Sequence, residues 1–493
     1  MTSRDTAPVP PARRLSQRTM LAYGFGSVAY GVKDNGFQTF LLLFYNQVMG
    51  LPAMSVGTAI MLALVVDAFI DPVIGAASDR TRHRWGRRHP WMYASAIPIA
   101  LGWLLLWNPP EMSQAAMLGW VFATSIVVRS AVSAYEVPSA ALTPELSADY
   151  DERTRIISYR YVFGWVGGLA MLVMAYSMFL VPEPGQPNGL LNRGGYQAYA
   201  VTGAVLMFVA ILLSAWGTHH EIGRLPKPEI ERLSLRQIAA ELVQTIRNRA
   251  FVILMAAGLC VYVAQGISFA LSNYFYNFVW ELRGGALMLL PAALMTGVLI
   301  AFAIGPRLSA RLGKRRAGSV LAALGTLLLT LPYWLRLLGA FPAVGSPLLV
   351  PALFGILIVN IGCGVAAMII GGSMMADVVE QSEITTGRRS EGVFFAGGFF
   401  VQKCSSGIGI FLAGSILAVA GFPAEAQPGA VSVGTIDRLT VIFCAAYLAL
   451  GLTAAWFYSR FPFGRDEHEQ HLSELSSDHD AAHPQRLQEN NNA

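Results

Sequence analysis

Two aspartates lie inside a long apolar run, in the stretch VVDAFIDPVIGAASD that begins at Val65. Asp67 and Asp71 are four residues apart, so a helix would place both carboxylates on one face. Two desolvated carboxylates this close cannot both stay ionised unless a cation lies between them, and otherwise one of them takes up a proton. The pair therefore predicts a switchable cation site.

Further charged residues lie inside apolar segments, where an ionisable side chain costs roughly 2.5 to 3.5 kcal/mol at a helix centre. They are Lys33 and Asp34 in the first segment, Arg129 and Glu136 in the fourth, Arg160 in the fifth and Lys403 in the eleventh. The acids fall in the first half of the chain, and Lys403 is the deep cation of the second. A permanent salt bridge of the aspartates to Lys403 or Arg160 is the alternative to an ion pathway. Taken together, these intramembrane charges favour a cation pathway over a permanent salt bridge.

The composition explains the apolar surroundings of these charges. Hydrophobic residues make up 54% of the 493 and charged residues only 13%, against about 25% charged in soluble domains. Segments of about 20 apolar residues, the length that spans a bilayer, recur twelve times. Their approximate ranges are 20–48, 54–78, 91–109, 115–145, 157–182, 197–218, 249–278, 286–309, 317–338, 346–378, 392–421 and 434–460. This pattern predicts an all-α polytopic membrane protein with twelve transmembrane helices.

The organisation follows from the same segments. We expect a cytoplasmic N-terminal arm at 1–19, a six-helix bundle at 20–218 and a linker with an amphipathic helix at 219–248. A second six-helix bundle would span 249–460, and a disordered cytoplasmic tail 461–493. Similar Gly-basic turns, DRTRHRWGRRH at 79–89 and SARLGKRR at 309–316, fall between the second and third helices of each half. They indicate two pseudo-symmetric halves, as in transporters built from repeats.

Basic residues concentrate in alternate loops, which places both termini in the cytoplasm of a multi-pass inner-membrane protein. The net charge of +5 then reflects topology and anionic lipid, so a nucleic-acid partner need not be invoked. Acidic and basic residues at these loops predict a cytoplasmic gate: Asp79, Arg87, Arg88, Asp377, Glu380 and Arg388. The four cysteines lie in apolar segments without metal-like spacing, so no metal beyond a possible sodium ion and no cofactor beyond the coupling ion is expected.

Several motifs together resemble one family, the glycoside-pentoside-hexuronide cation symporters of the major facilitator superfamily. They are KDNG at 33–36, DAFIDPVIG at 67–75, RHRWGRRHPW at 82–91, EVPSAALTPEL at 136–146, YR at 159–160, ADVVEQSE at 376–383 and QKCSSG at 402–407. The resemblance spans both halves in order. It implies the major facilitator fold and symport of a sugar or glycoside with a cation, by alternating access.

The resemblance also assigns roles to single residues. Asp67 and Asp71 match the family's cation ligands, and Glu136 lies between the cation and substrate sites. Asp34 and Arg160 match residues that bind substrate hydroxyls, with Lys33 beside them, and Lys403 matches a lysine that faces the acidic cluster. Lys403 and Arg129 are therefore expected to adjust its charge. Ser133, one turn before Glu136, is the first candidate for a further cation ligand.

Departures from the family pattern leave alternatives open. Ile70 replaces an asparagine whose amide helps to coordinate sodium, so a proton is at least as good a candidate for the coupling ion. Ala140 and Met368 replace aromatic residues that stack on sugars, which keeps an amphipathic substrate such as a lysophospholipid open. Arg129 could neutralise Glu136, meet an anionic substrate or form an interhelical pair.

Other functional classes are also open on the sequence. A non-transporting sensor with a transporter fold could retain the same pocket. An intramembrane aspartic enzyme would place its aspartates on two helices, one within a GxGD sequence, and neither feature is present. We therefore expect a monomeric transporter of a small molecule and not an enzyme.

Overall fold

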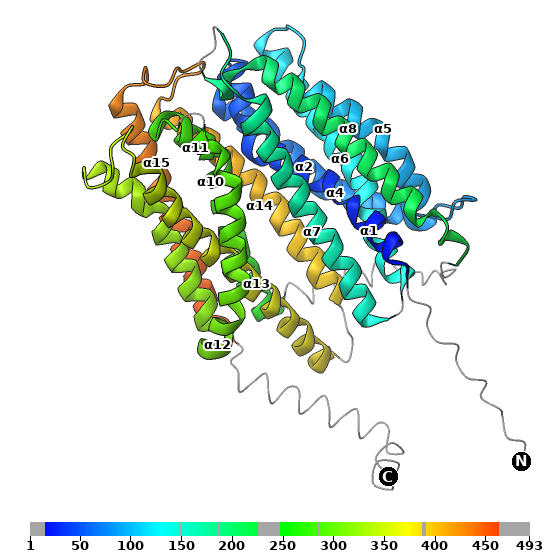
Figure 1. Cartoon of the computed structure of the whole chain (residues 1–493). Coiled ribbons are helices and arrows are strands. Elements are labelled where there is room, and N and C mark those ends of the chain that lie inside the picture. Colours follow the sequence, from blue (N-terminus) through cyan, green and yellow to red (C-terminus); the bar gives the residue numbers. More distant parts are fainter. Residues whose placement is uncertain are drawn as a thin grey trace, which may run out of the picture. The chain divides into compact units, whose positions relative to one another are not determined.

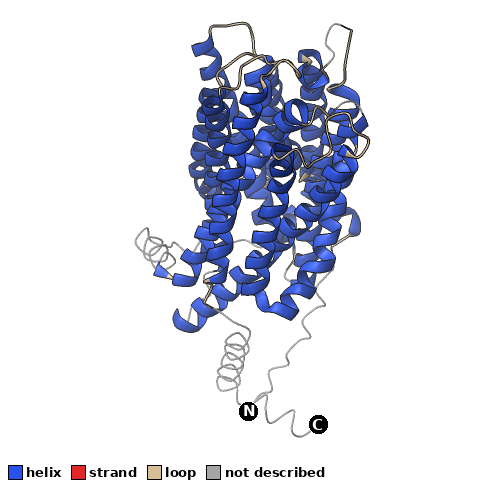
Figure 2. Ribbon diagram, turned by 90° about the vertical axis from the view of Figure 1, so that its left-hand side faces the viewer, coloured by secondary structure: helices blue, strands red, loops and turns tan. Residues whose placement is uncertain are grey.

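The computed structural model describes residues 15–147, 149–184, 188–224, 247–282, 285–386 and 391–462. Within these ranges the regular structure is helical and contains no strand (Figure 2). The predicted all-α class is therefore confirmed. The predicted arm, linker and tail lie largely outside the described residues.

The chain divides into two compact units, labelled by helix in Figure 1. The first unit takes residues up to 41 and from 62 to 230, and the second takes 42–61 and everything from 231 on. The first contains α1 (Gln17–Phe25), α2 (Val28–Asn35), η1 (Gly36–Phe40), most of α4 (Ala53–Arg80), α5 (His89–Trp107), α6 (Gln114–Leu146), α7 (Tyr150–Met174), η3 (Ala175–Phe179), η4 (Gly189–Leu191), α8 (Arg193–His219) and η5 (Ile222–Arg224). The second contains η2 (Phe44–Val48), α10 (Arg249–Tyr274), η6 (Phe275–Val279), α11 (Gly285–Met288), α12 (Leu290–Leu337), α13 (Leu349–Thr386), α14 (Glu391–Ala420) and α15 (Val433–Ser459), and the short α3 (Leu41–Leu43) lies at the boundary. The division into halves at 219–248 remains a prediction.

Ten helices in the described residues are long and apolar enough to cross a membrane. One of them, Gly285–Leu337, has 53 residues and a non-helical Gly313 at φ 74° and ψ 154°. This is a backbone conformation that favours glycine, and it falls in the predicted turn at 309–316. The first predicted segment, 20–48, is divided into short α and π pieces. With that segment and the two parts of the long helix, the structure accommodates the twelve predicted passes.

A repeated π-helical motif supports internal duplication. Phe44–Val48 reads FYNQV and Phe275–Val279 reads FYNFV, at the ends of the first and seventh predicted segments. Both form π-helices that close with the same backbone hydrogen bonds, from Leu51 N to Tyr45 O at 3.0 Å and from Leu282 N to Tyr276 O at 2.8 Å. The two segments therefore occupy equivalent positions in the two halves of the sequence.

Residues 42–61 pack within the second unit through a buried polar network. The Gln47 amide donates to Pro423 O at 2.9 Å and accepts from Ala426 N at 2.8 Å. Asn46 accepts a hydrogen bond from the Tyr274 hydroxyl at 2.8 Å. Since buried backbone groups require partners, these amides fix the start of α4 against the loop that follows α14.

Close backbone contact between α2 and α7 positions the charged residues of the first unit. A Cβ atom on Gly31 would lie 2.0 Å from Gly164 O, so only glycine permits this approach. Asn35 continues the contact by donating to Gly168 O at 3.0 Å. Lys33 and Asp34 are thereby held on a helix that packs directly against the helix bearing Arg160.

Candidate cation and substrate site

Asp67 on α4 is held by two side chains of α6. Its Oδ2 accepts hydrogen bonds from Arg129 Nε at 3.0 Å and Nη2 at 2.8 Å, and its Oδ1 accepts one from Ser133 Oγ at 3.0 Å. Arg129 is 5% exposed and Asp67 2%. Both carboxylate oxygens are thus engaged by protein groups, one of them through a buried salt bridge.

Arg129 therefore pairs with Asp67 in this structure. This is the interhelical pair among the alternatives open on the sequence, and Asp67 on α4 is its acid. Its guanidinium also lies 5.3 Å from the Phe37 ring centroid, where the aromatic face stabilises a cation. A buried ion pair of this kind is expensive to break from one side, because the remaining charge loses its partner.

Lys33 and Asp34 form a second ion pair on α2. Lys33 Nζ lies 2.6 Å from Asp34 Oδ1, although the two residues are adjacent in sequence. The ammonium also lies 4.3 Å from the ring centroid of Tyr30. The Lys33 side chain is almost completely buried, while that of Asp34 is 26% exposed. Asp34 is thus the more exposed member of this pair.

Arg160 on α7 is oriented by hydroxyl groups. Its Nη1 donates to Tyr23 Oη and to Ser139 Oγ, each at 2.8 Å, and its guanidinium lies over the Tyr23 ring. Glu136 on α6 acts electrostatically on both Arg160 and Tyr30. Arg160 thus lies beside Glu136 on the side of α7 that faces α6 through Ser139.

The other predicted residues are placed as follows. Asp71 is half-buried on α4, one turn after Asp67. Lys403 is half-buried on α14 in the second unit, so its approach to the acidic cluster stays a prediction. The described residues contain no group of three His, Cys, Asp or Glu side chains that could hold a metal ion.

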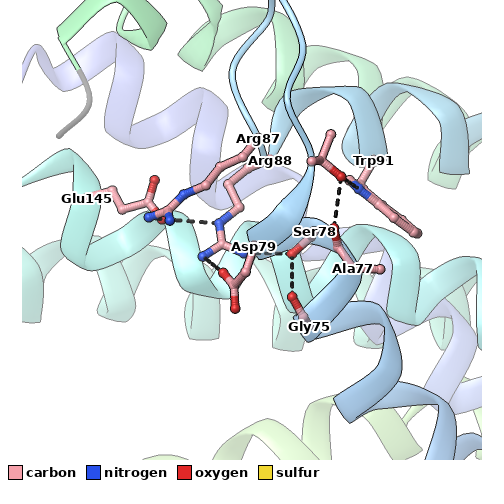
Figure 3. A network of polar contacts seen from close by, with 9 residues as sticks. Gly75, Ala77, Ser78, Asp79, Arg87, Arg88, Trp91 and Glu145 are labelled. Atoms are coloured by element: carbon pink, nitrogen blue, oxygen red, sulfur yellow. Dashed lines mark hydrogen bonds and ion pairs between the residues drawn. The ribbon is translucent and has the colours of Figure 1, made fainter. Parts of the chain in front are cut away.

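The predicted gate residues Arg87 and Arg88 converge on Glu145 at the end of α6 (Figure 3). Arg87 Nη2 and Arg88 Nε lie 2.7 and 3.1 Å from Glu145 Oε1. Arg88 also donates to Ser78 Oγ at 2.6 Å and pairs with Asp79 at 2.5 Å. This Arg88 cluster, comprising Ser78, Asp79, Arg87, Arg88 and Glu145, connects the ends of α4 and α6 with the loop between α4 and α5.

The second unit has a corresponding ion pair. Lys314, in the turn at 309–316, lies with its Nζ 2.6 Å from Asp377 Oδ1 near the end of α13. In both units a basic residue after the second predicted helix pairs with an acid at the end of the fourth. Glu380 follows one turn later on α13, and Arg388 lies outside the described residues. The pairing extends the duplication indicated by the Gly-basic turns.

The sequence analysis did not single out Glu145, Tyr23 or Tyr30. Glu145 is the penultimate residue of the motif EVPSAALTPEL, where the fourth apolar segment ends, so its position at a helix end was an available signal. Tyr23 and Tyr30 precede KDNG at helical spacing, but tyrosines are frequent in apolar segments. Only their contacts distinguish these two, that of Tyr23 to Arg160 and that of Tyr30 to Lys33.

The fold is that of the major facilitator transporters. The inward-open xylose transporter XylE from Escherichia coli aligns with a TM-score of 0.61 at 13% identity, covering 92% of this chain and 98% of that structure. A peptide transporter POT mutant aligns with a TM-score of 0.62 at 11% identity, covering 91% and 97%. These two likenesses show the fold that this chain shares with solved transporter structures.

The chain belongs to the MFS/sugar transport protein family, whose model matches residues 22–465. It is 29% identical to the uncharacterized symporter sll1374 of Synechocystis sp., over 91% of this chain and 95% of that protein. It is 25% identical to the glucuronide carrier protein homolog of Escherichia coli, covering 90% and 93%. It is also 26% identical to the isoprimeverose transporter of Lactiplantibacillus pentosus, covering 89% and 87%. The resemblance to the glycoside-pentoside-hexuronide symporters is confirmed, and the protein is a transporter rather than an enzyme.

The two acids of the Arg88 cluster should differ in their contribution to stability. Glu145→Gln should lower the free energy of unfolding by about 3 to 5 kcal/mol, because two arginines share this buried carboxylate. Asp79→Asn should cost at most about 1 kcal/mol, since Asp79 is 55% exposed and an exposed ion pair contributes little. Unfolding of the purified variants in detergent measures both. Equal losses for the two variants would contradict the central position of Glu145.

Proposed function

We propose that this transporter couples uptake of a sugar or glycoside to the entry of one proton. The sugar class is supported by the family description and by relatives named as transporters of glucuronide and isoprimeverose. Coupling to a cation is supported by a further relative, the putative glycoside/cation symporter YagG of Escherichia coli, which is 25% identical. The family assignment favours transport over the sensor alternative.

One observation favours the proton over sodium as the coupling ion: the Arg129 guanidinium donates two hydrogen bonds to the Asp67 carboxylate. Sodium bound between Asp67 and Asp71 would compete with a guanidinium and with the Ser133 hydroxyl for the Asp67 oxygens. Ile70, one residue before Asp71, supplies no side-chain oxygen to complete a coordination shell. A proton needs a single carboxylate oxygen, which Asp71 supplies.

The charges of the first unit support a stoichiometry of one. Its described membrane-spanning segments contain four carboxylates and three cations that the sequence analysis singled out. They are Asp34, Asp67, Asp71 and Glu136, and Lys33, Arg129 and Arg160. An excess of one negative charge in an apolar environment favours the binding of one cation. In this proposal Asp71 carries the exchangeable proton and Lys403 adjusts the balance from the second half.

The substrate would bind at Asp34 and Arg160, with Lys33 and Glu136 beside them. Carboxylate and guanidinium groups are strong hydrogen-bond acceptors and donors for hydroxyls. Proton and sugar then stabilise the same charged network, and each increases the affinity for the other. Alternating access would follow from rearrangement of the two halves.

The remaining assignments are part of the same proposal. The Arg88 cluster and the Lys314–Asp377 pair would form a cytoplasmic gate, together with Glu380 and Arg388. Both termini would lie in the cytoplasm of a bacterial-type inner membrane, as the positive-inside rule indicates. The protein would act as a monomer without a nucleic-acid partner.

Reconstituted vesicles test the coupling ion. Isoprimeverose, a glucuronide and a panel of other glycosides would be offered under a pH gradient without sodium, and under a sodium gradient at clamped pH. Accumulation of one of them should follow the pH gradient alone. Accumulation on the sodium gradient would show that further oxygens complete a sodium shell and would contradict the proton assignment. Failure of both gradients would contradict symport.

Neutralising Asp71 should remove the coupling to the cation while substrate binding remains. Asp71→Asn should abolish uphill accumulation but preserve expression and substrate exchange across the vesicle membrane, because it removes a desolvated carboxylate together with its proton. Asp437→Asn is the matched control, since Asp437 is 40% exposed and pairs with Arg336. Uphill transport by Asp71→Asn at the wild-type level would exclude Asp71 as the coupling residue.

A further inference from the structure

Phe37 is a buried aromatic residue that contacts Arg129 from the π-helical turn that follows Asp34. It lies in η1, three residues after Asp34, and is 1% exposed. The Arg129 guanidinium lies 5.3 Å from its ring centroid, and the same guanidinium donates two hydrogen bonds to Asp67. A continuous series of contacts therefore runs from the end of α2, through the Phe37 ring and Arg129, to the Asp67 carboxylate.

The Phe37 ring also packs against Trp103 of α5. Their ring centroids are 6.5 Å apart, and Trp103 is itself completely buried. Trp103 lies so close to the backbone of η1 that a Cβ atom on Gly36 would be 2.3 Å from its Cη2 atom. Because protein interiors are close-packed and transmit strain, a displacement of the Phe37 ring is passed to the backbone of η1. The helix α2, which bears Asp34, continues directly into η1.

The attraction between Arg129 and Phe37 depends on the negative charge that surrounds the guanidinium. An aromatic face attracts a desolvated cation more strongly than a hydrated one, and Arg129 is 5% exposed. Asp71 lies one turn after Asp67 on α4, so its protonation removes a negative charge from the helix to which Arg129 is hydrogen-bonded. The Phe37 face then competes for the guanidinium with less opposing charge on α4.

We infer that Phe37 is the positioning residue that links proton binding on α4 to the placement of Asp34 on α2. Its aromatic face holds Arg129, and its ring passes a movement of that guanidinium to η1 and α2. The inference rests on the proposed function, and it names an uncharged side chain as the link between the cation site and the substrate site of the first unit.

Transport by Phe37→Leu tests the aromatic face. In reconstituted vesicles the probe would be isoprimeverose, or the glycoside of the panel that wild-type protein accumulates. Uphill uptake should fall about tenfold relative to exchange at equal pH on both sides, because a desolvated cation–π contact of the coupling route is lost. Exchange itself should stay within about twofold of wild type, since it requires binding without net proton transfer. A merely structural role would lower uptake and exchange together.

Phe40→Leu is the matched control. Phe40 lies in the same π-helix and is as deeply buried as Phe37, but its ring packs on three tyrosines, Tyr176, Tyr196 and Tyr199. This variant should keep the wild-type ratio of uptake to exchange. An equal loss of that ratio in Phe40→Leu and Phe37→Leu would overturn the inference.

A fluorinated ring tests the aromatic face with the side-chain shape nearly preserved. Pentafluorophenylalanine at position 37 keeps the ring, but its fluorine atoms withdraw electrons from the face that attracts the guanidinium. It should lower the ratio of uptake to exchange as Phe37→Leu does, whereas the same residue at position 40 should not. If Phe37→Leu yields too little folded protein, this variant decides the test.

The outcomes separate the inference from the proposed function. If wild-type protein follows the pH gradient and the variants at position 37 keep its ratio of uptake to exchange, proton-coupled symport stands and the role of Phe37 is overturned. If wild-type protein accumulates glycoside on the sodium gradient alone, or on neither gradient, the proposed function fails and the inference fails with it.

Discussion

The buried pair of Asp67 and Arg129 is the interaction on which the proposed mechanism depends. A carboxylate and a guanidinium in an apolar environment persist only when each satisfies the other, and Ser133 takes the remaining Asp67 oxygen. The pair joins α4 to α6 at the depth where a coupling cation was predicted. In the proposed mechanism it gives Asp67 a permanent cation and leaves the exchangeable charge to Asp71.

The remaining charges of the first unit are organised around this pair. Arg129 on α6 lies 5.3 Å from the ring centroid of Phe37, in η1 directly after α2, and Arg160 of α7 donates to Ser139 of α6. The glycine contact between α2 and α7 holds these residues on adjoining helices. In the proposed mechanism, a change of charge on α4 or α6 alters the electrostatic potential at Asp34, where a sugar hydroxyl would bind. Such continuity is the physical requirement for coupling two ligands.

The sequence predicted the fold and family well, because apolar length and charged motifs are local features. It did not anticipate the break of the first segment into π-helical pieces, since FYNQV has no special propensity to distinguish it. Ionisable side chains in apolar segments, such as Asp67, could be recognised individually from the sequence because their burial costs free energy. The residue that each of them contacts could not be recognised. The sequence offered Lys403 or Arg160 as partners of the aspartates, whereas the contact that the helix packing makes to Asp67 comes from Arg129, 62 residues later in sequence. Pairing across helices depends on register, which no local pattern encodes.

A double-mutant cycle between Asp67 and Arg129 tests the central claim most directly. The free energies of unfolding of Asp67→Asn, Arg129→Gln and the double variant would be measured by detergent-induced unfolding of the purified proteins. Each single variant should lose about 3 kcal/mol or more, because it leaves a buried charge without its partner, and the double variant should be more stable than either. Additive losses would show that the two side chains do not depend on each other, and would contradict the role of Arg129 as the permanent cation of Asp67.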